Sequence, residues 1–245
     1  MAKIPGRNPV LEALAGTRRL KEIFLAHNSQ GEAVEKIISR AEEQRVKLTR
    51  VSESRIAELA GTANPQGVVA LGEELKNLHL ENVLESALAE SDNPRFLLLD
   101  QIQDPYNFGA LIRTARAAGF SAVIYPKNRS CQVTPTVVKA SAGAVEWIDL
   151  CQVTNLNRAL FRLKEASCWI AGADAAAEQL YYQADLTGAL GLVIGSEGSG
   201  LRRLVRENCD FLVAIPVLEH PGSLNASVAA GIIVFETVRQ NKILT

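Results

Sequence analysis

Along most of the chain, short apolar runs alternate with stretches in which apolar residues recur at the spacing of a helix. Short apolar runs, such as residues 21–26 and 96–100, have the length of β-strands, whereas residues 32–44 place apolar side chains at the spacing of an amphipathic helix. The run at 96–100 begins with four consecutive apolar residues, which is typical of a strand buried on both faces of a parallel sheet. The pattern therefore predicts an α/β protein.

Two groups of elements follow from this pattern. In the first 72 residues it predicts a helix at 9–15, with Asn8 as its N-cap and Gly16 after its end, then strands at 21–26, 46–51 and 67–71 and helices at 32–44 and 52–60. From residue 96 it predicts strands at 96–100, 122–125, 146–150, 169–173, 192–194 and 211–215, with helices at 108–118, 137–142, 156–166, 201–207 and 224–239.

The second group fits an open parallel sheet with helices on both faces. Between the groups, residues 72–94 are richer in Glu, Asn and Ser, and a weakly periodic part at 78–88 could form a helix. We therefore expect a small N-terminal α/β domain at 1–75, a linker at 76–94 and a larger α/β domain at 95–245.

Composition narrows the class of protein. Of the 245 residues, 47% are hydrophobic, which is enough to build a core. No apolar run approaches the roughly 20 residues that span a bilayer, and the first residues lack the apolar segment of a signal peptide, so we expect a cytoplasmic protein without a membrane segment. The cysteines form no CxxC or Cys/His cluster, which predicts buried thiols and neither a zinc site nor disulfides; they are Cys131, Cys151, Cys168 and Cys209.

Charge is unevenly distributed, although the formal net charge is only −1. Residues 1–72 hold 11 Lys and Arg against 8 Asp and Glu, and the rest of the chain holds 15 against 19. A basic first segment is compatible with contact to nucleic acid. An excess of this size is also usual for a solvated surface, so charge alone does not decide between the two.

A first candidate motif follows the predicted strand at 96–100. The sequence NFGALIRTA at 107–115 begins with Asn107, which could cap a helix, and carries Arg113 two turns later. On a helix that starts here, both side chains would lie near the carboxyl ends of the strands, where open α/β sheets bind ligands. The structural alternative is an ordinary cap and a surface arginine.

Two further motifs follow later strands. The sequence LVIGSEGSGL at 192–201 ends an apolar run in three glycines around Glu197, and glycine allows both a tight turn and close approach of a ligand. Glu197 could cap the following helix or hold a catalytic group or a substrate hydroxyl. The third motif runs from Ile215 through SLNASVA at 223–229, where small residues again begin a helix.

In this order and spacing, the three motifs resemble the signature motifs of the SpoU (TrmH) family of RNA ribose 2′-O-methyltransferases, in the SPOUT superfamily. The small N-terminal unit is similar to the RNA-binding domain of some members. The stretches PKNRS at 126–130 and FETVRQ at 235–240 resemble most closely the branch that methylates a guanosine of 23S ribosomal RNA. Ala226, where many relatives have valine, and the loop at 219–221 depart from the family pattern and leave the RNA target open.

The resemblance implies features that the periodic pattern does not show. It implies a trefoil knot, bent S-adenosylmethionine held by loops at the carboxyl edge of the sheet, and a homodimer through the larger domain. The residues implied to bind the cofactor are Ile194, Gly195, Ser196, Gly200, Ile215, Leu224 and Ala226. Those implied to surround the reacting ribose are Asn107, Arg113, Glu197, Ser223 and Asn225.

Methyl transfer needs the ribose 2′-hydroxyl in line with the sulfonium methyl and a route for its proton to leave. The family assigns activation of that hydroxyl to the residue matching Arg113. Because an arginine side chain stays protonated at neutral pH, we expect Arg113 instead to clamp a phosphate or polarise the 2′-oxygen. Candidate phosphate contacts are Arg7, Arg18, Arg19, Lys21, Lys127, Arg129, Arg202, Arg203 and Arg206.

Three alternatives remain from sequence. A transfer RNA 2′-O-methyltransferase and a non-catalytic RNA-binding protein would both use the same scaffold, and the joint presence of the five ribose-site residues argues against the second. A dinucleotide-dependent oxidoreductase is disfavoured, because the glycines occur late in the chain as Gly-x-x-Gly-x-Gly rather than as G-x-G-x-x-G in the first βα turn.

Overall fold

The computed structural model describes residues 1–62, 64–218 and 224–241. The chain divides into two compact units, the first formed by residues 1–76 and 132–147 and the second by residues 77–131 and those from 148 onward. The domain limits at 75 and 94 stay a prediction. The pattern along the chain contained no sign that residues 132–147 would group with the first unit.

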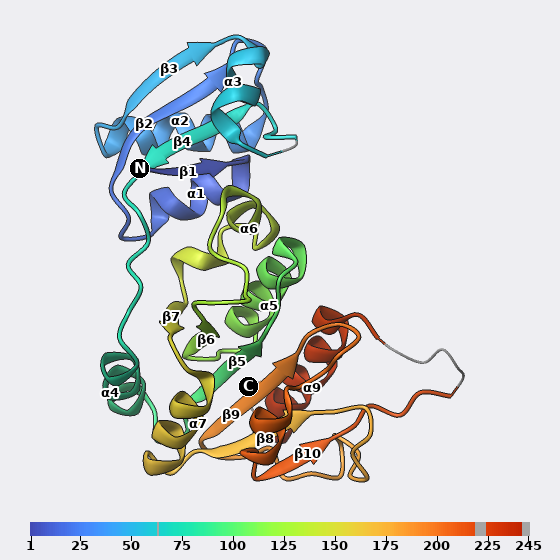
Figure 1. Ribbon diagram of the computed structural model, residues 1–245. Helices are drawn as coiled ribbons and strands as arrows, with labels where there is room; N and C mark the ends of the chain where they lie inside the picture. Colours follow the sequence, from blue (N-terminus) through green and yellow to red (C-terminus); the bar gives the residue numbers. More distant parts are fainter. Residues whose placement is uncertain (63, 219–223, 242–245) are drawn as a thin grey trace. The chain divides into compact units, whose positions relative to one another are not determined.

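The first unit holds a four-stranded sheet. In chain order it contains β1 (Ala2–Pro5), α1 (Arg7–Ala15), β2 (Leu20–Ala26), α2 (Glu32–Glu43), β3 (Lys47–Val51), α3 (Glu53–Ala60) and β4 (Val68–Gly72). The strand order is β1-β4-β2-β3, in which β2 and β3 are parallel and β4 is antiparallel to both neighbours (Figure 1). The pattern did not predict β1, because four residues are too few to show a period.

Residues 132–147 add α6 (Pro135–Ala140) and the 3₁₀ helix η1 (Ala144–Glu146) to this unit. α6 contacts β1, and η1 contacts α1. Trp147 Nε1 also donates a hydrogen bond to Glu12 Oε2 at 2.7 Å. In chain order the segment lies between two strands of the second unit, so the chain passes from one unit to the other three times.

A buried ion pair joins this segment to the start of the chain. Arg18 Nη2 lies 2.9 Å from Glu146 Oε1, and the two side chains are only 4% and 2% exposed. Burial lowers the pKa of Arg18 and raises the pKa of Glu146, and in each case the charge of the partner opposes the shift. Because both charges are out of water, removal of either one would leave the other uncompensated.

The second unit holds six parallel strands. It contains α4 (Leu80–Glu90), β5 (Arg95–Asp100), α5 (Pro105–Ala117), β6 (Ala122–Pro126), β7 (Asp149–Val153), α7 (Leu156–Glu165), β8 (Trp169–Ala173), β9 (Leu190–Gly195), α8 (Arg203–Glu207), β10 (Phe211–Val213) and α9 (Ala226–Gln240). The strand order is β10-β8-β9-β5-β6-β7, and each neighbouring pair is parallel. The predicted parallel sheet is confirmed, whereas the trefoil knot stays a prediction.

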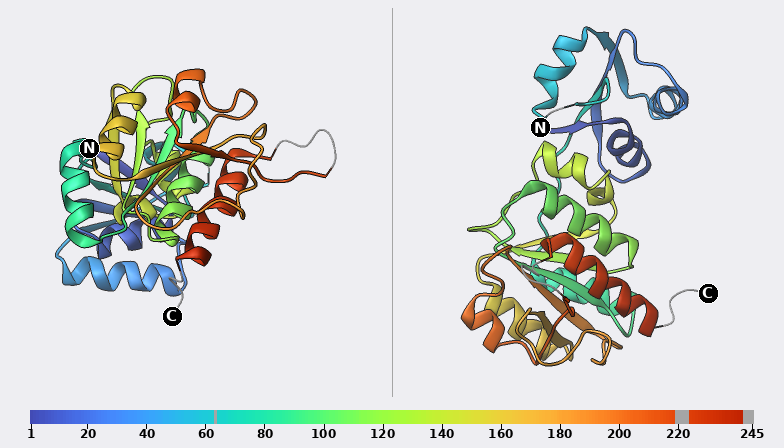
Figure 2. Two further views of the ribbon diagram at one scale, coloured as in Figure 1. Left: turned by 90° about the horizontal axis from the view of Figure 1, so that it is seen from below. Right: turned by 90° about the vertical axis from the view of Figure 1, so that its right-hand side faces the viewer.

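Helices cover both faces of this sheet. On one face α4, α7 and α8 pack in a single apolar cluster that includes Leu98, Ile124 and Val193 (Figure 2). On the other face α5 packs against α9, and α9 contacts β9. The central strands β5 and β9 lie side by side, with Asp100 opposite Gly195, so the loops that follow them leave the same edge of the sheet together.

Two helices begin earlier than predicted and have other caps. α1 starts at Arg7 after Gly6, so Asn8 lies inside the helix and does not cap it. α5 starts at Pro105, and the Asp104 side chain accepts a hydrogen bond from the backbone N–H of Asn107 at 2.8 Å. Proline at the first helical position and aspartate before it are a favoured pair, which explains why Asn107 is not the cap. Its side chain is thereby left for another partner.

Other predicted limits also differ. The strand expected at 146–150 is wrong at its start, because η1 occupies residues up to Glu146 and β7 begins at Asp149. The helix expected at 201–207 begins at Arg203, and the one expected at 224–239 begins at Ala226. β10 ends at Val213, so Ile215 lies beyond the strand.

The four cysteines are free thiols, of which Cys151 and Cys168 are buried and Cys131 and Cys209 partly buried. Burial raises the pKa of Cys151 and of Cys209 to about 12, and that of Cys168 to about 11. Within the described ranges, no group of three or more His, Cys, Asp or Glu side chains could hold a metal ion, and no helix combines the length and apolar character needed to cross a membrane.

The raised thiol pKa values predict selective protection from alkylation. Because the thiolate is the reactive form, we expect Cys151, Cys168 and Cys209 to resist iodoacetamide at mildly alkaline pH in the folded protein. All three should react once guanidinium chloride unfolds the chain. Mass spectrometry of tryptic peptides measures both conditions, and labelling of Cys151 at the same rate in each would contradict the expectation.

The buried pair predicts a large loss of stability when one charge is removed. We expect Glu146→Ala to lower the free energy of unfolding by about 3–5 kcal/mol, measured by urea denaturation, because Arg18 is left buried without its partner. The double variant Arg18→Met/Glu146→Leu should recover most of that loss. Glu32→Ala, in the exposed pair with Lys36, is the matched control and should change stability little. An equal loss in the single and double variants would argue against a buried-charge penalty.

Candidate functional site

The loop after β9 has a backbone path that requires glycine. A Cβ atom on Gly195 would lie 2.2 Å from the carbonyl carbon of Gly200, so no other residue permits this approach. Ser196 N–H donates to the Gly200 carbonyl at 3.2 Å, and Gly200 N–H donates to the Ser196 carbonyl at 3.0 Å, which closes the loop. Gly198 and Gly200 have φ angles of +84° and +62°. The predicted tight turn is confirmed.

A second contact fixes the end of this loop to the neighbouring strand. The fully buried carboxylate of Asp100, the last residue of β5, accepts hydrogen bonds from Arg202 N–H at 2.8 Å and from Arg202 Nε at 2.7 Å. Hydrogen bonds between charged groups are stronger than neutral ones, and here the acceptor lies out of water. The loop after β9 is therefore held at both ends.

Three side chains from separate segments meet at Glu197. Glu197 Oε1 accepts hydrogen bonds from Asn107 Nδ2 at 2.9 Å and from Asn225 Nδ2, and Asn225 Nδ2 also donates to Asn107 Oδ1 at 2.9 Å. Asn107 lies in the first turn of α5, Glu197 in the loop after β9, and Asn225 directly before α9. We call these three residues the Glu197 cluster. The structure thus brings together three of the five residues predicted around the ribose.

The same residues cap α9. Asn225 Oδ1 accepts hydrogen bonds from the N–H groups of Ser227 and Val228 at 3.0 and 3.3 Å, and Glu197 accepts one from Ala226 N–H at 3.2 Å. A carboxylate is favoured at this position because a helix N-terminus carries partial positive charge. One predicted role of Glu197 was to cap the helix that follows it in sequence, which is α8. Glu197 instead caps α9.

Arg113 and Ser223 are not part of this cluster in the structure. Arg113 lies on α5, exposed, and no hydrogen bond or ion pair joins it to another residue in the described part of the chain. It lies six positions after Asn107 along the helix, so its side chain points about 120° away from that of Asn107 around the helix axis. Ser223 lies outside the described residues.

The residues predicted to bind the cofactor lie at the end of β9, in the loop that follows it, after β10 and at the start of α9. Ile194 is the buried penultimate residue of β9, and the loop from Gly195 to Gly200 follows it. Ile215 is partly exposed after β10, and Leu224 is 39% exposed before α9. Ala226 is buried at the start of that helix, where its N–H contacts Glu197.

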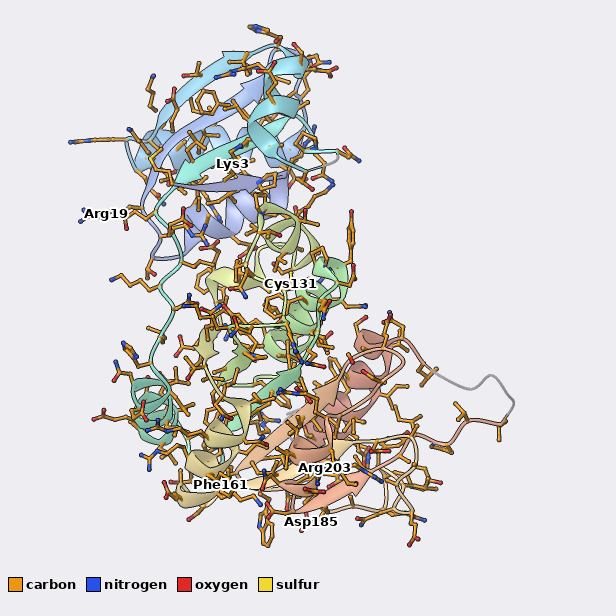
Figure 3. The ribbon with its side chains drawn as sticks, viewed as in Figure 1. Lys3, Arg19, Cys131, Phe161, Asp185 and Arg203 are labelled. Carbon is orange, nitrogen blue, oxygen red and sulfur yellow. The ribbon has the colours of Figure 1, made fainter. Side chains whose placement is uncertain are left out.

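The candidate phosphate contacts differ in their availability. The prediction for Arg18 is wrong, because its side chain is buried in the pair with Glu146. Arg7 Nε donates to the Gln66 carbonyl at 3.2 Å, whereas Arg19 is exposed and extends away from the ribbon of the first unit (Figure 3). The side chains of Lys127 and Arg129, after β6, are also exposed.

The three arginines near α8 already have acidic partners. Arg202 pairs with Asp100 as described, and the other two pairs are Arg203 with Glu207 and Arg206 with Asp174, at 2.8 Å each. A phosphate would have to displace these carboxylates. The structure therefore favours the exposed Arg19 and Arg129 over the arginines of this segment.

A cleft of about 310 Å³ opens beside the Glu197 cluster. It is lined by Gln101, Ile102, Gln103, Asp104, Asn107, Ser196, Glu197 and Ser199. Residues 101–104 join β5 to α5 and were not among the predicted site residues. Their position directly after a buried parallel strand was a usable signal, because such strand ends form the ligand-binding edge of an open sheet.

Both units of the chain match known families of proteins. Residues 94–235 match the model of the SpoU rRNA methylase family, and residues 3–78 match that of the RNA 2′-O ribose methyltransferase substrate-binding domain. The 23S rRNA (guanosine-2′-O-)-methyltransferase RlmB of Escherichia coli is 40% identical over 222 residues, which cover 91% of each chain. RlmB of Vibrio vulnificus is 42% identical over 222 residues, covering 91% of this chain and 90% of its own.

Solved structures show the same fold along the whole chain. An RNA 2′-O ribose methyltransferase is similar with a TM-score of 0.81 and 25% identity, over 99% of this chain and 89% of its own. The AdoMet-bound rRNA methyltransferase of Sinorhizobium meliloti has a TM-score of 0.80 and 24% identity, over 100% and 88%. The two family matches and the RlmB relatives cover both units, and the chain therefore belongs to the SpoU family of RNA 2′-O-ribose methyltransferases.

Proposed function

We propose that the protein transfers the methyl group of S-adenosylmethionine to the ribose 2′-hydroxyl of a guanosine in 23S ribosomal RNA. The observation that carries this proposal is the Glu197 cluster, because it joins one residue from each of the three signature motifs at the ligand-binding edge of the sheet. The RlmB relatives, which align with nine-tenths of the chain, are named for this reaction. A ribosomal RNA substrate makes the cytoplasm the proposed location.

The loop after β9 fits a cofactor that is held by main-chain groups. A Cβ atom on Gly198 or Gly200 would meet nothing within 4 Å, so the backbone there is open to a ligand. Two structures of similar fold, from Sinorhizobium meliloti and Streptomyces viridochromogenes, are described with AdoMet bound. When bound, S-adenosylmethionine supplies an electrophilic methyl group. The residues proposed to hold it are Ile194, Gly195, Ser196, Gly200, Ile215, Leu224 and Ala226.

The polar residues around the proposed ribose site have different tasks. The planar fork of N–H donors on Arg113 suits a phosphate or the 2′-oxygen, and its exposure leaves it accessible to RNA. The proposed task of the Glu197 carboxylate, which accepts hydrogen bonds from Asn107 and Asn225, is to orient the ribose or accept the proton that leaves the 2′-hydroxyl. Ser223 joins this set on the motif alone.

RNA contact is proposed for both units. Residues 3–78 match a substrate-binding model, and Arg7 and Arg19 lie within that range. Lys127 and Arg129 follow β6 in the second unit and are exposed. Lysine and arginine contacts to phosphate release counterions, so binding through these four residues should weaken steeply as salt increases.

A homodimer through the second unit is part of the proposal. Three large apolar side chains are exposed on the paired helices α5 and α9: Tyr106 is 63%, Val228 51% and Phe235 50% exposed. Val228 and Phe235 are seven residues apart and share one face of α9. Large exposed apolar side chains on paired helices are typical of a subunit interface.

Methyl transfer to RNA tests the proposed function directly. We expect tritium from labelled S-adenosylmethionine to enter a 23S ribosomal RNA transcript at a single guanosine, located by the resistance of its phosphodiester to alkali. Bacillus subtilis YacO, 39% identical over 235 residues, is assigned to a TrmH family of tRNA/rRNA methyltransferases, so transfer RNA is the second substrate to assay. Methylation of transfer RNA alone would overturn the ribosomal assignment.

Arg113→Ala separates chemistry from cofactor binding. We expect it to lower the rate of methyl transfer by about 100-fold or more, because a group that polarises the 2′-oxygen is lost, while calorimetry shows unchanged binding of S-adenosylmethionine. Arg116→Ala, at another exposed arginine of α5, is the matched control and should retain activity. A near-wild-type rate for Arg113→Ala would remove this residue from the reaction.

Phe235→Asp tests the homodimer. A charge placed in the centre of an apolar interface should shift the protein from dimer to monomer, as measured by sedimentation velocity. Phe161→Asp, at an exposed phenylalanine of α7 on the opposite face of the sheet, is the control and should leave the dimer intact. A wild-type protein that sediments as a monomer would refute the proposed assembly.

A further inference from the structure

We propose that the cleft beside the Glu197 cluster binds the base of the target nucleotide and selects guanine through Asp104. This inference rests on the proposed function, because it states how the same site chooses its nucleotide. The cleft shares Asn107 and Glu197 with the cluster. A base held in the cleft therefore has its own ribose next to the residues proposed to act on the 2′-hydroxyl.

The chemistry of the lining fits a neutral group that donates hydrogen bonds. Two carboxylates, Asp104 and Glu197, and two hydroxyls, Ser196 and Ser199, face the same space of about 310 Å³ as the carboxamides of Gln101 and Gln103. Among the described residues that line it, none is a lysine, arginine or histidine. A phosphate is disfavoured by two carboxylates without a cation, whereas the edge of a base with N–H groups is favoured.

Among the four RNA bases, guanine has the matching edge. Its N1–H and 2-amino groups lie side by side and can both donate to one carboxylate, and its O6 can accept from a carboxamide. Adenine and cytosine place an unprotonated ring nitrogen beside a single amino group, and that nitrogen would face the carboxylate. Uracil offers one N–H between two carbonyls. RNA-binding proteins commonly read unstacked bases along this edge.

Of the two carboxylates, Asp104 is the one that the proposed reaction does not use. Glu197 Oε1 already accepts three hydrogen bonds within the protein, and the Glu197 carboxylate is proposed to act on the ribose. Asp104 accepts one, from Asn107 N–H to Oδ2 at 2.8 Å, and within the described ranges its Oδ1 accepts none. Its role as the cap of α5 also fixes its position, so the carboxylate is oriented before RNA arrives.

The loop that carries these side chains is held in place. The Ile102 side chain is only 3% exposed, and its carbonyl accepts hydrogen bonds from Cys131 N–H at 2.8 Å and Ser130 Oγ at 3.2 Å. Gln101 has a φ of +63°, a left-handed conformation that is costly for residues other than glycine and is concentrated at functional sites. Gln101 and Gln103, the sequence neighbours of the anchored Ile102, both line the cleft.

Asp104→Asn tests the inference while preserving the cap, because asparagine caps helices as well as aspartate does. The substrates are two forms of the same RNA fragment, with guanosine or inosine at the target; inosine differs only in lacking the 2-amino group. We expect the wild-type protein to prefer guanosine in kcat/KM by about tenfold to a hundredfold, and Asp104→Asn to reduce this preference to about twofold. Asp92→Asn, at an exposed carboxylate before β5, should keep the wild-type ratio.

Each outcome is decisive. An unchanged ratio in Asp104→Asn, or an equal fall of kcat/KM for both fragments with S-adenosylmethionine binding retained, would overturn the assignment of Asp104 as a base reader. A wild-type protein that methylates both fragments equally would do the same and leave the proposed function standing. A wild-type protein that methylates neither fragment, nor intact ribosomal or transfer RNA, would remove the proposed function and this inference together.

Discussion

Three hydrogen bonds converge on one oxygen of Glu197, and they join α5, the loop after β9 and the start of α9. Each hydrogen bond by itself contributes only about 0.5–1.5 kcal/mol, or somewhat more with a charged acceptor. Because the three share one acceptor, loss of that carboxylate would remove all three hydrogen bonds at once. The positive end of α9 adds to the same interaction. One negative charge thus assembles residues that are far apart in sequence.

The sheet supplies the rigid frame for this charge. β5 and β9 lie at the centre of the six strands, and Asp100 and Gly195 end them in register. Gly195 lets the loop fold back against Gly200, and the Asp100 carboxylate holds Arg202 at the far end of that loop. Glu197 is therefore presented from a short segment fixed on both sides, which is what a site that must orient a ribose requires.

Much of this arrangement could be predicted from sequence, for identifiable reasons. Continuous apolar runs mark the central strands, and polar residues after them lie at one edge, so Asn107 and Glu197 could be expected there from the pattern. Asn225 could be added only because its motif resembles that of the SpoU family. The cap of α5 could not be predicted in this way. Asp104 and Asn107 are both residue types that cap helices, and the pattern does not show which of the two takes the capping position. Arg18 and Arg19 are adjacent arginines that the sequence pattern does not distinguish. The Arg18 side chain is buried against Glu146, whereas Arg19 is exposed. Only the tertiary path of the chain distinguishes them.

Residues 132–147 have a consequence for how such proteins can change in evolution. They belong to the first unit, although they are encoded between β6 and β7 of the second, and they carry Glu146, the partner of Arg18. A gene fusion that exchanged only the segment before residue 77 would separate these two charges. The first unit therefore cannot be exchanged as one continuous segment of the chain. A new substrate-binding unit would also need a matching replacement of residues 132–147. We therefore expect substitutions in this segment and in the segment before residue 77 to be correlated during evolution.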